Sequence, residues 1–95
     1  MKPHTKNYIE FFGIGEQDIV LCTNCEFVSN DLHHVYIKGM GGRKTYEHNG
    51  KTLDINGVEN IIALCRGCHV KAHSGILLRE YLYKLQENHI LNHKK

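Results

Sequence analysis

The sequence predicts a small α+β domain that a bound metal ion helps to hold together, and three observations lead to this prediction. The chain has 95 residues, enough for a single domain, 1–95, with a thin hydrophobic core. Short runs of β-branched and aromatic residues are typical of strands, whereas apolar residues near the end recur at helical spacing. Two Cys-x-x-Cys pairs, Cys22/Cys25 and Cys65/Cys68, have the spacing of zinc ligands.

The first half of the chain is predicted to be mainly extended. Residues 1–21 form a lead-in whose apolar side chains we expect to pack as scaffold, including a short strand. Residues 32–37 have the composition of a strand. Further on, Asn49-Gly50 joins two short segments and predicts a β-hairpin that protrudes from the domain.

The chain beyond the second cysteine pair is predicted to be helical. His69 and His73 are four residues apart, so they share one face of a helix. A C-terminal helix is expected over about residues 76–91. Its apolar stripe, which can cover the core or the zinc end, consists of Leu78, Tyr81, Leu82 and Leu85.

The four cysteines could form two disulfides, with three alternative pairings, or hold one metal ion. The start of the chain has no apolar segment typical of a signal peptide, and no stretch approaches the roughly 20 apolar residues of a membrane span. We therefore expect a cytoplasmic protein with reduced thiols, no membrane partner, and a structural Zn²⁺ on four thiolates.

The formal net charge of +2 does not by itself indicate a nucleic-acid-binding protein. Several cations gather in the middle third, where a solvated loop explains them equally well. Arg43 is the first candidate for a phosphate contact and Lys38 the second, with Arg66 and Lys71 behind them.

The adjacent histidines His33 and His34 point to opposite faces if they lie on a strand, so they can do different jobs. One can bind a metal ion together with His69 and His73, while the other activates a water molecule. Hydrolysis of a phosphodiester needs both a nucleophile at neutral pH and a positive centre near the phosphate. Three imidazoles on an ion leave coordination positions open, as such a reaction requires.

Three stretches of the sequence closely resemble the HNH endonucleases, whose core is a ββα-metal (His-Me finger) fold. They are Asp31-Leu32-His33-His34-Val35, then residues 59–69 with Asn60, and His73. The resemblance covers residues 22–73. It implies metal-dependent hydrolysis of DNA phosphodiester bonds, by nicking or double-strand cleavage, in a domain that adds a four-cysteine zinc site, an inserted β-hairpin and a C-terminal helix.

The resemblance also implies a role for each site residue. His34 would be the general base, Asn60 would orient it, and the catalytic divalent ion would lie on His33, His69 and His73. The structural zinc would lie on Cys22, Cys25, Cys65 and Cys68. Many family members have an aspartate where His33 stands, so Mg²⁺, Mn²⁺, Ni²⁺ and Zn²⁺ all remain candidates. Residues 35–59 exceed the minimal spacing of the motif and are expected to include a DNA-contacting insert.

Double-stranded DNA is the expected partner, together with a targeting protein such as a phage terminase, in the host cytoplasm if a phage encodes the chain. One alternative is a non-catalytic zinc module in which two cysteines and two histidines, Cys22, Cys25, His69 and His73, bind one ion. A second is a DNA-binding or assembly module with the same fold and no activity. The remaining histidines, which are His4, His48, His89 and His93, are expected at the surface.

Overall fold

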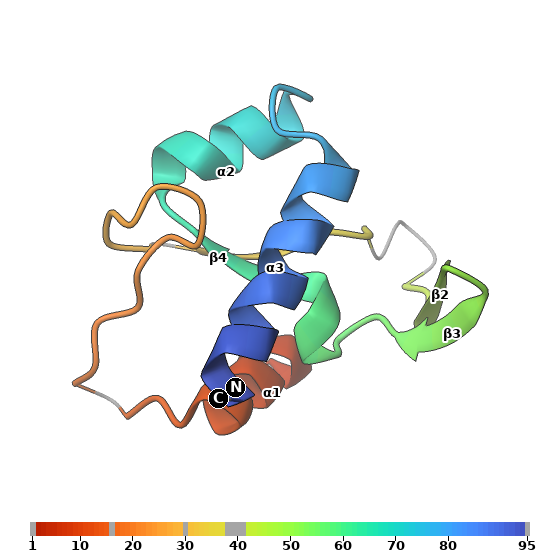
Figure 1. The fold of residues 1–95 in the computed structure, drawn as a ribbon, viewed down its shortest axis with the longest axis horizontal. Helices are drawn as coiled ribbons and strands as arrows, with labels where there is room; N and C mark the ends of the chain where they lie inside the picture. Colours follow the sequence, from red (N-terminus) through yellow and green to blue (C-terminus); the bar gives the residue numbers. More distant parts are fainter. Residues whose placement is uncertain (1, 16, 30, 38–41, 95) are drawn as a thin grey trace.

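The computed structural model describes residues 2–15, 17–29, 31–37 and 42–94, and it is an α+β fold, as the sequence predicts (Figure 1). Its helices are α1 (Pro3–Phe12), α2 (Arg66–His73) and α3 (Arg79–Lys94), with a 3-10 turn, η1, at Val58–Asn60. Its strands are β1 (Asp31–His34), β2 (Thr45–His48), β3 (Lys51–Asp54) and β4 (Ile61–Leu64). β1 pairs with β4 and β2 pairs with β3, both antiparallel.

Strand β4 is the centre of the hydrophobic core. All four of its side chains are fully buried, and they alternate between two clusters as the period of a strand requires. Ile62 and Leu64 pack on the side of α3, whereas Ile61 and Ala63 pack against Tyr8 of α1. In Figure 1, α3 accordingly crosses β4, and α1 lies beneath the far end of α3.

The lead-in is a helix and not only the scaffold strand that the sequence predicts. Helix α1 begins at Pro3, whose fixed φ suits the first helical position, and ends at Phe12, where Gly13 follows with a left-handed φ of 64°. Its residues Tyr8 and Phe12 do pack as scaffold. The expected strand is reduced to an isolated bridge between Leu21 and Val28.

The strand predicted over residues 32–37 is shorter than expected, because β1 ends at His34. The side chain of Asn60 replaces a partner strand here: its Oδ1 accepts a hydrogen bond from the Tyr36 N–H (2.6 Å), and its Nδ2 donates to the Tyr36 carbonyl (3.0 Å). Both backbone groups of Tyr36 are therefore satisfied without a sheet.

The β2–β3 hairpin forms where Asn49-Gly50 predicts it and projects from the body in Figure 1. Asn49 and Gly50 both have positive φ, 52° and 77°, as the tight turn demands. The base of the hairpin is anchored by Tyr46, which is 3 % exposed and shares a hydrogen bond of 2.7 Å with the Tyr83 hydroxyl of α3.

Helix α3 begins at Arg79, three residues later than predicted, and the expected apolar stripe is only half buried. Leu82 and Leu85 pack against the core, but Leu78 and Tyr81 are 60 % and 47 % exposed. The buried face instead continues through Tyr83, Gln86 and Ile90. Among the helices in the described part of the chain, none is both long enough and apolar enough to cross a membrane.

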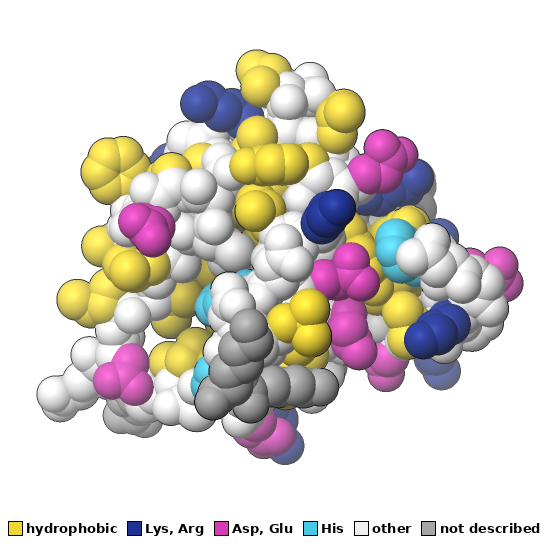
Figure 2. All heavy atoms as spheres, viewed as in Figure 1, with side chains coloured by type: hydrophobic (Ala, Val, Ile, Leu, Met, Phe, Trp, Pro, Cys, Tyr) yellow, Lys and Arg dark blue, Asp and Glu magenta, His cyan; other side chains and the backbone are white. Residues whose placement is uncertain are grey.

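The surface in Figure 2 carries positive, negative and apolar side chains intermixed. Lys and Arg side chains occur at separate points on this face and do not gather into one broad patch. This distribution agrees with the small net charge of +2.

Candidate functional site

The four cysteines meet at one point, where the loop before β1 lies against the start of α2. Their sulfur atoms all lie within 4.8 Å of one another. Cys25 Sγ is 3.5 Å from Cys65 Sγ and 3.6 Å from Cys68 Sγ. A disulfide would need about 2.05 Å, whereas four thiolates around a tetrahedral ion lie about 3.8 Å apart. The cysteines are therefore free and positioned to bind a metal ion.

The surroundings of this cluster favour thiolates at some positions and oppose them at others. Burial opposes ionisation of the Cys22 thiol, but backbone N–H groups stabilise the thiolate and lower its pKa to about 7. These N–H groups belong to Cys65, Cys25 and Asn24. Burial raises the pKa of Cys68, although a hydrogen bond from Asn24 lowers it. A bound cation would remove this conflict by stabilising all four thiolates.

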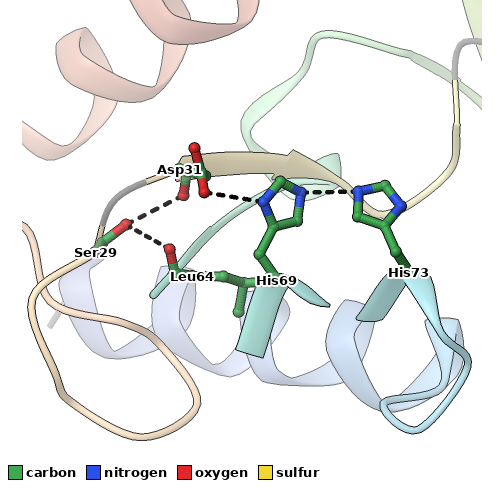
Figure 3. A network of polar contacts seen from close by, with 5 residues as sticks. All are labelled: Ser29, Asp31, Leu64, His69 and His73. Carbon is green, nitrogen blue, oxygen red and sulfur yellow. Dashed lines mark hydrogen bonds and ion pairs between the residues drawn. The ribbon is translucent and has the colours of Figure 1, made fainter. Parts of the chain in front are cut away.

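A second cluster consists of three histidines from two elements: His33 comes from β1, and His69 and His73 come from α2. Their ligating nitrogens lie within 4.8 Å of one another. The Nε2 atoms of His69 and His73 are only 2.9 Å apart and face each other (Figure 3). Two imidazoles on one ion at 2.0–2.1 Å would place their nitrogens about 2.9–3.4 Å apart, so the arrangement fits an ion with little movement.

Burial is the main reason that His33 stays neutral. Only 8 % of the residue is exposed, and burial, followed by the imidazoles of His69, His73 and His34, lowers the pKa of His33 to about 4. Neutral imidazole is the form that binds a metal ion. At pH 7 His33 therefore needs to lose no proton to act as a ligand.

Asp31 supports the three-histidine cluster, although the sequence alone assigned it no role. Its carboxylate accepts a hydrogen bond of 3.0 Å from Nδ1 of His69, which leaves Nε2 of His69 to face His73 (Figure 3). Ser29 braces the same strand by donating to the carbonyls of Asp31 and Leu64. A carboxylate behind a ligating histidine is a common support at metal sites. The available signal was an acidic residue two positions before His33, on the same face of the strand.

His34 points to the other side of β1 and has different partners. Its Nε2 lies 3.0 Å from Oδ1 of Asn56, and its ring packs against His4 of α1 with centroids 4.5 Å apart. Asn56 is fixed in turn, since its carbonyl accepts a hydrogen bond of 2.9 Å from the Asn7 amide and its N–H donates to Asp54. The opposite orientations of His33 and His34 follow from the two-residue period of a strand.

Asn60 is completely buried, and among the described residues its side chain forms hydrogen bonds only with backbone groups. Besides its two hydrogen bonds to Tyr36, its Nδ2 donates to the Ile55 carbonyl (2.8 Å), and its own carbonyl accepts from Val35 (2.8 Å). It thus fixes the chain just after His34 and just before Asn56. Its contact with His34 is indirect, through these segments.

A cleft of about 250 Å³ is lined both by the three-histidine cluster and by His34. It is lined by Leu32, His33, His34, Ile37, His69 and His73. A longer groove of about 420 Å³ continues from it and shares His33, Ile37 and His73 with it. A small anion in the cleft could therefore reach the three-histidine cluster and His34 together.

The predicted phosphate contacts occupy different places. Arg43 lines the groove, and its Nε donates to the Ile37 carbonyl at 3.0 Å. Lys38, the second candidate, lies outside the described residues. Arg66 and Lys71 are exposed on α2 and do not line the histidine cleft.

Three of the four remaining histidines are not the free surface residues that were expected. His4, His48 and His89 are half-buried, and only His93 is exposed. His48 Nδ1 lies 2.8 Å from the Tyr36 hydroxyl, and His89 stacks on Phe12 with centroids 4.5 Å apart. The sequence does not reveal these contacts because the partners come from distant segments.

No family model, curated protein or solved structure matches this chain. Any function must therefore be inferred from the residues and geometry of the two clusters.

Proposed function

We propose that the chain is a metal-dependent endonuclease of the HNH kind that hydrolyses DNA phosphodiester bonds. The observation that carries this proposal is the cleft in which His33, His69 and His73 are grouped as ligands while His34 approaches from the other side. Strands β1 and β4 with the following helix α2 form a ββα arrangement around these residues. That arrangement supports a ββα-metal core.

We assign a structural Zn²⁺ to the four cysteines and a catalytic divalent cation to the three histidines. When bound, the catalytic cation would supply positive charge to the phosphate and to the leaving oxygen. A ligand set without a carboxylate suits softer ions such as Ni²⁺ and Zn²⁺ better than Mg²⁺. The cysteine site would stabilise the fold. Because Cys68 is followed directly by His69, loss of the zinc would also displace this ligand of the catalytic cation.

His34 would take the proton from the attacking water. Its Nε2–H donates to Asn56 Oδ1 in this assignment, so the free lone pair is on Nδ1. As the water oxygen bonds to phosphorus, its proton moves to Nδ1 and the bond to the leaving oxygen breaks. Asn60 would act by fixing the backbone on both sides of this pair.

We further propose DNA as the substrate and a targeting protein, such as a terminase, as the source of sequence selection. The small net charge of +2, with intermixed charges on the face shown in Figure 2, supports weak recognition by the chain alone. The groove next to the cleft, with Arg43 on its wall, offers a path for a phosphate backbone.

The alternative site of two cysteines and two histidines conflicts with the geometry of the described residues. The four side chains that it requires fall into separate clusters, each with other partners. A non-catalytic module with both clusters remains the competing proposal, and activity separates it from the nuclease.

The test is plasmid nicking by the zinc-loaded protein with Mg²⁺, Mn²⁺, Ni²⁺ or Zn²⁺ added in parallel. We expect His34→Ala to keep its fold and both metals but to lose at least about 100-fold in nicking rate, because the general base is removed. His93→Ala, which changes an exposed histidine on α3, is the matched control. Nicking by His34→Ala at the rate of the unaltered chain would contradict the base assignment. Absence of nicking by the unaltered chain with all four ions would favour the non-catalytic module.

A further inference from the structure

We propose that the groove beside the histidine cleft is a subsite for the DNA strand, in which Arg79 binds a phosphate next to the one that is cut. This inference rests on the proposed function for the identity of the ligand. It adds a binding residue from α3, a helix that lies outside the HNH-like segment 22–73.

The groove lies directly beside the three-histidine cluster. It has a volume of about 420 Å³ and reaches the histidine cluster, because His33 and His73 belong to its wall. Apolar side chains, among them Val35, Ala72 and Leu77, form much of the remaining wall. Apolar walls with a few charged groups can accept the sugar and base edges of a strand whose phosphate meets those groups.

Arg79 is held in place before any ligand binds. Its guanidinium carbon lies 4.5 Å from the centroid of the Tyr36 ring. The Tyr36 ring is stacked in turn on Tyr46, with centroids 4.6 Å apart and an interplanar angle of 21°. Since Tyr46 is buried in the core, the stack ties an exposed arginine to a rigid part of the fold, which reduces the entropy lost on binding.

The hydrogen-bond donors of Arg79 are still available. Within the described part of the chain, Arg79 has the contact with Tyr36 but no hydrogen bond and no ion pair with another residue. The contact with Tyr36 places the guanidinium carbon over the ring and uses none of its N–H groups in a hydrogen bond. Such a planar fork binds phosphate oxygens in pairs.

The charge of the groove favours an anion. Arg43 and Arg79 line it, against Glu80 as the acidic residue of the lining. Arg43 uses Nε on the Ile37 carbonyl, and this hydrogen bond does not involve its two terminal nitrogens. We favour a DNA phosphate over an acidic peptide because the groove continues into the proposed phosphodiester site.

The experiment uses zinc-loaded protein that carries His34→Ala, so that the DNA is not cleaved. Fluorescence anisotropy measures how tightly it binds a fluorescein-labelled duplex of about 20 base pairs, from about 50 to about 250 mM NaCl. Loss of one phosphate contact lowers the slope of log affinity against log salt by about 0.9. We expect Arg79→Met, which keeps an unbranched apolar side chain beside Tyr36, to lower the slope by about 0.9 and to bind about tenfold more weakly. Arg79→Lys should retain the slope because it retains the charge.

Lys84→Met is the matched control, since Lys84 is exposed on the same helix and does not line the groove. It should leave slope and affinity unchanged. An unchanged slope for Arg79→Met, with intact zinc content and melting temperature, would overturn the subsite while leaving nicking and the proposed function untouched. A second result would also overturn the phosphate subsite: the slope for Arg79→Met is unchanged, and a polyglutamate peptide at equal charge displaces the duplex. This result would favour a carboxylate-rich partner for the groove. A chain that binds DNA with the expected slopes but does not nick would support the subsite and contradict the nuclease.

Discussion

At the scale of single residues, one carboxylate and one amide fix the imidazoles on the two sides of β1. Asp31 accepts a hydrogen bond from His69, and Asn56 pairs with His34. Each contact uses one ring nitrogen, and in His69 the other nitrogen, Nε2, faces His73. His69 and His34 thus have different hydrogen-bond partners, an acidic one for His69 and an amide for His34.

We predict that Asn56→Ala lowers the nicking rate by about 10- to 100-fold, the usual effect of losing such a supporting partner. Without Oδ1 the His34 ring can turn and exchange its tautomer. Asn56→Asp keeps an acceptor oxygen and should restore most of the rate. Imidazole ¹⁵N spectra of the zinc-loaded protein should show His34 protonated on Nε2, and this signature should be lost in Asn56→Ala. Asn88→Ala, on the exposed side of α3, should change neither rate nor spectrum.

We predict that Asp31→Ala weakens the binding of a divalent ion to the three histidines by about 10- to 100-fold. The Nδ1 partner of His69 is lost, and the ring is no longer held with Nε2 towards His73. Calorimetric titration with Ni²⁺ measures this affinity, while the zinc content of the cysteine site should stay the same. Glu87→Gln removes an acidic group elsewhere on the surface and controls for the change in net charge. Equal Ni²⁺ affinity in Asp31→Ala and the unaltered chain would contradict the supporting role.

At the scale of elements, the cysteine cluster joins the loop before β1 to the start of α2. Cys65 precedes α2, and Cys68 lies in its first turn, one residue before His69. Asn24 adds a hydrogen bond from its amide to Cys68 Sγ at 3.4 Å and accepts one from the Tyr81 hydroxyl of α3. The cysteine cluster therefore sets the position of the helix that carries two of the three clustered histidines.

We predict that Cys65→Ser loses the bound zinc and unfolds most of the chain at about 25 °C, because zinc binding of order 10 kcal/mol is comparable to the stability of a small domain. Zinc content by mass spectrometry and far-ultraviolet circular dichroism check this outcome. Val70→Ala, an exposed position on the same helix, should keep its zinc and its melting temperature. Retention of both by Cys65→Ser would contradict a structural ion at this site.

The contact between α1 and α3 should make stability depend on pH. Burial, and then the charge of His93, lowers the pKa of His89 below its ordinary value of 6.5, and His89 stacks on Phe12. As the pH falls below about 6.5, the unfolded chain takes up the proton first, so the free energy of unfolding decreases. Above that pH both states are neutral at His89 and the effect is absent.

We predict that His89→Phe reduces this acid destabilisation, because the aromatic stack is kept and the titrating group is removed. Urea unfolding between about pH 4 and pH 8 measures it, with the two curves converging to a constant difference above about pH 7. Since His33 titrates with a lowered pKa in both proteins, the difference between the curves isolates His89. Parallel curves over the whole range would contradict the assignment.

At the scale of the whole molecule, the sequence could predict those parts of the fold that depend on local signals. The hairpin follows from Asn49-Gly50, and the cysteine cluster follows from two pairs at zinc spacing. Helix α1 was not predicted, although Pro3 and Gly13 mark its ends. The expected C-terminal stripe included Leu78 and Tyr81, because helical spacing alone does not show which face a helix buries.

In the candidate site, too, local sequence signals predicted some features and could not predict others. The strand and helix periods predicted that one of the two adjacent histidines joins His69 and His73, and the resemblance indicated His33, which the structure does place beside them. The contacts of His34 with His4 and Asn56 were not, since they join segments that are distant in sequence. The contact of Arg79 with Tyr36 also becomes visible only in three dimensions, whereas Asp31 has a local signal in its place two residues before His33. The catalytic role of the site stays a prediction, which the nicking assay tests.

The clamp made by Asn60 has a consequence for how this architecture can diversify. By binding Tyr36 and Ile55, it holds the two ends of the segment between them side by side, whatever lies in the middle. The tip of the hairpin at Asn49-Gly50 is exposed, and doubling the length of a loop costs only about 0.6 kcal/mol. Segments of other lengths and sequences can therefore replace the tip without moving the histidines. The hairpin tip could then vary while the histidine clusters keep their positions.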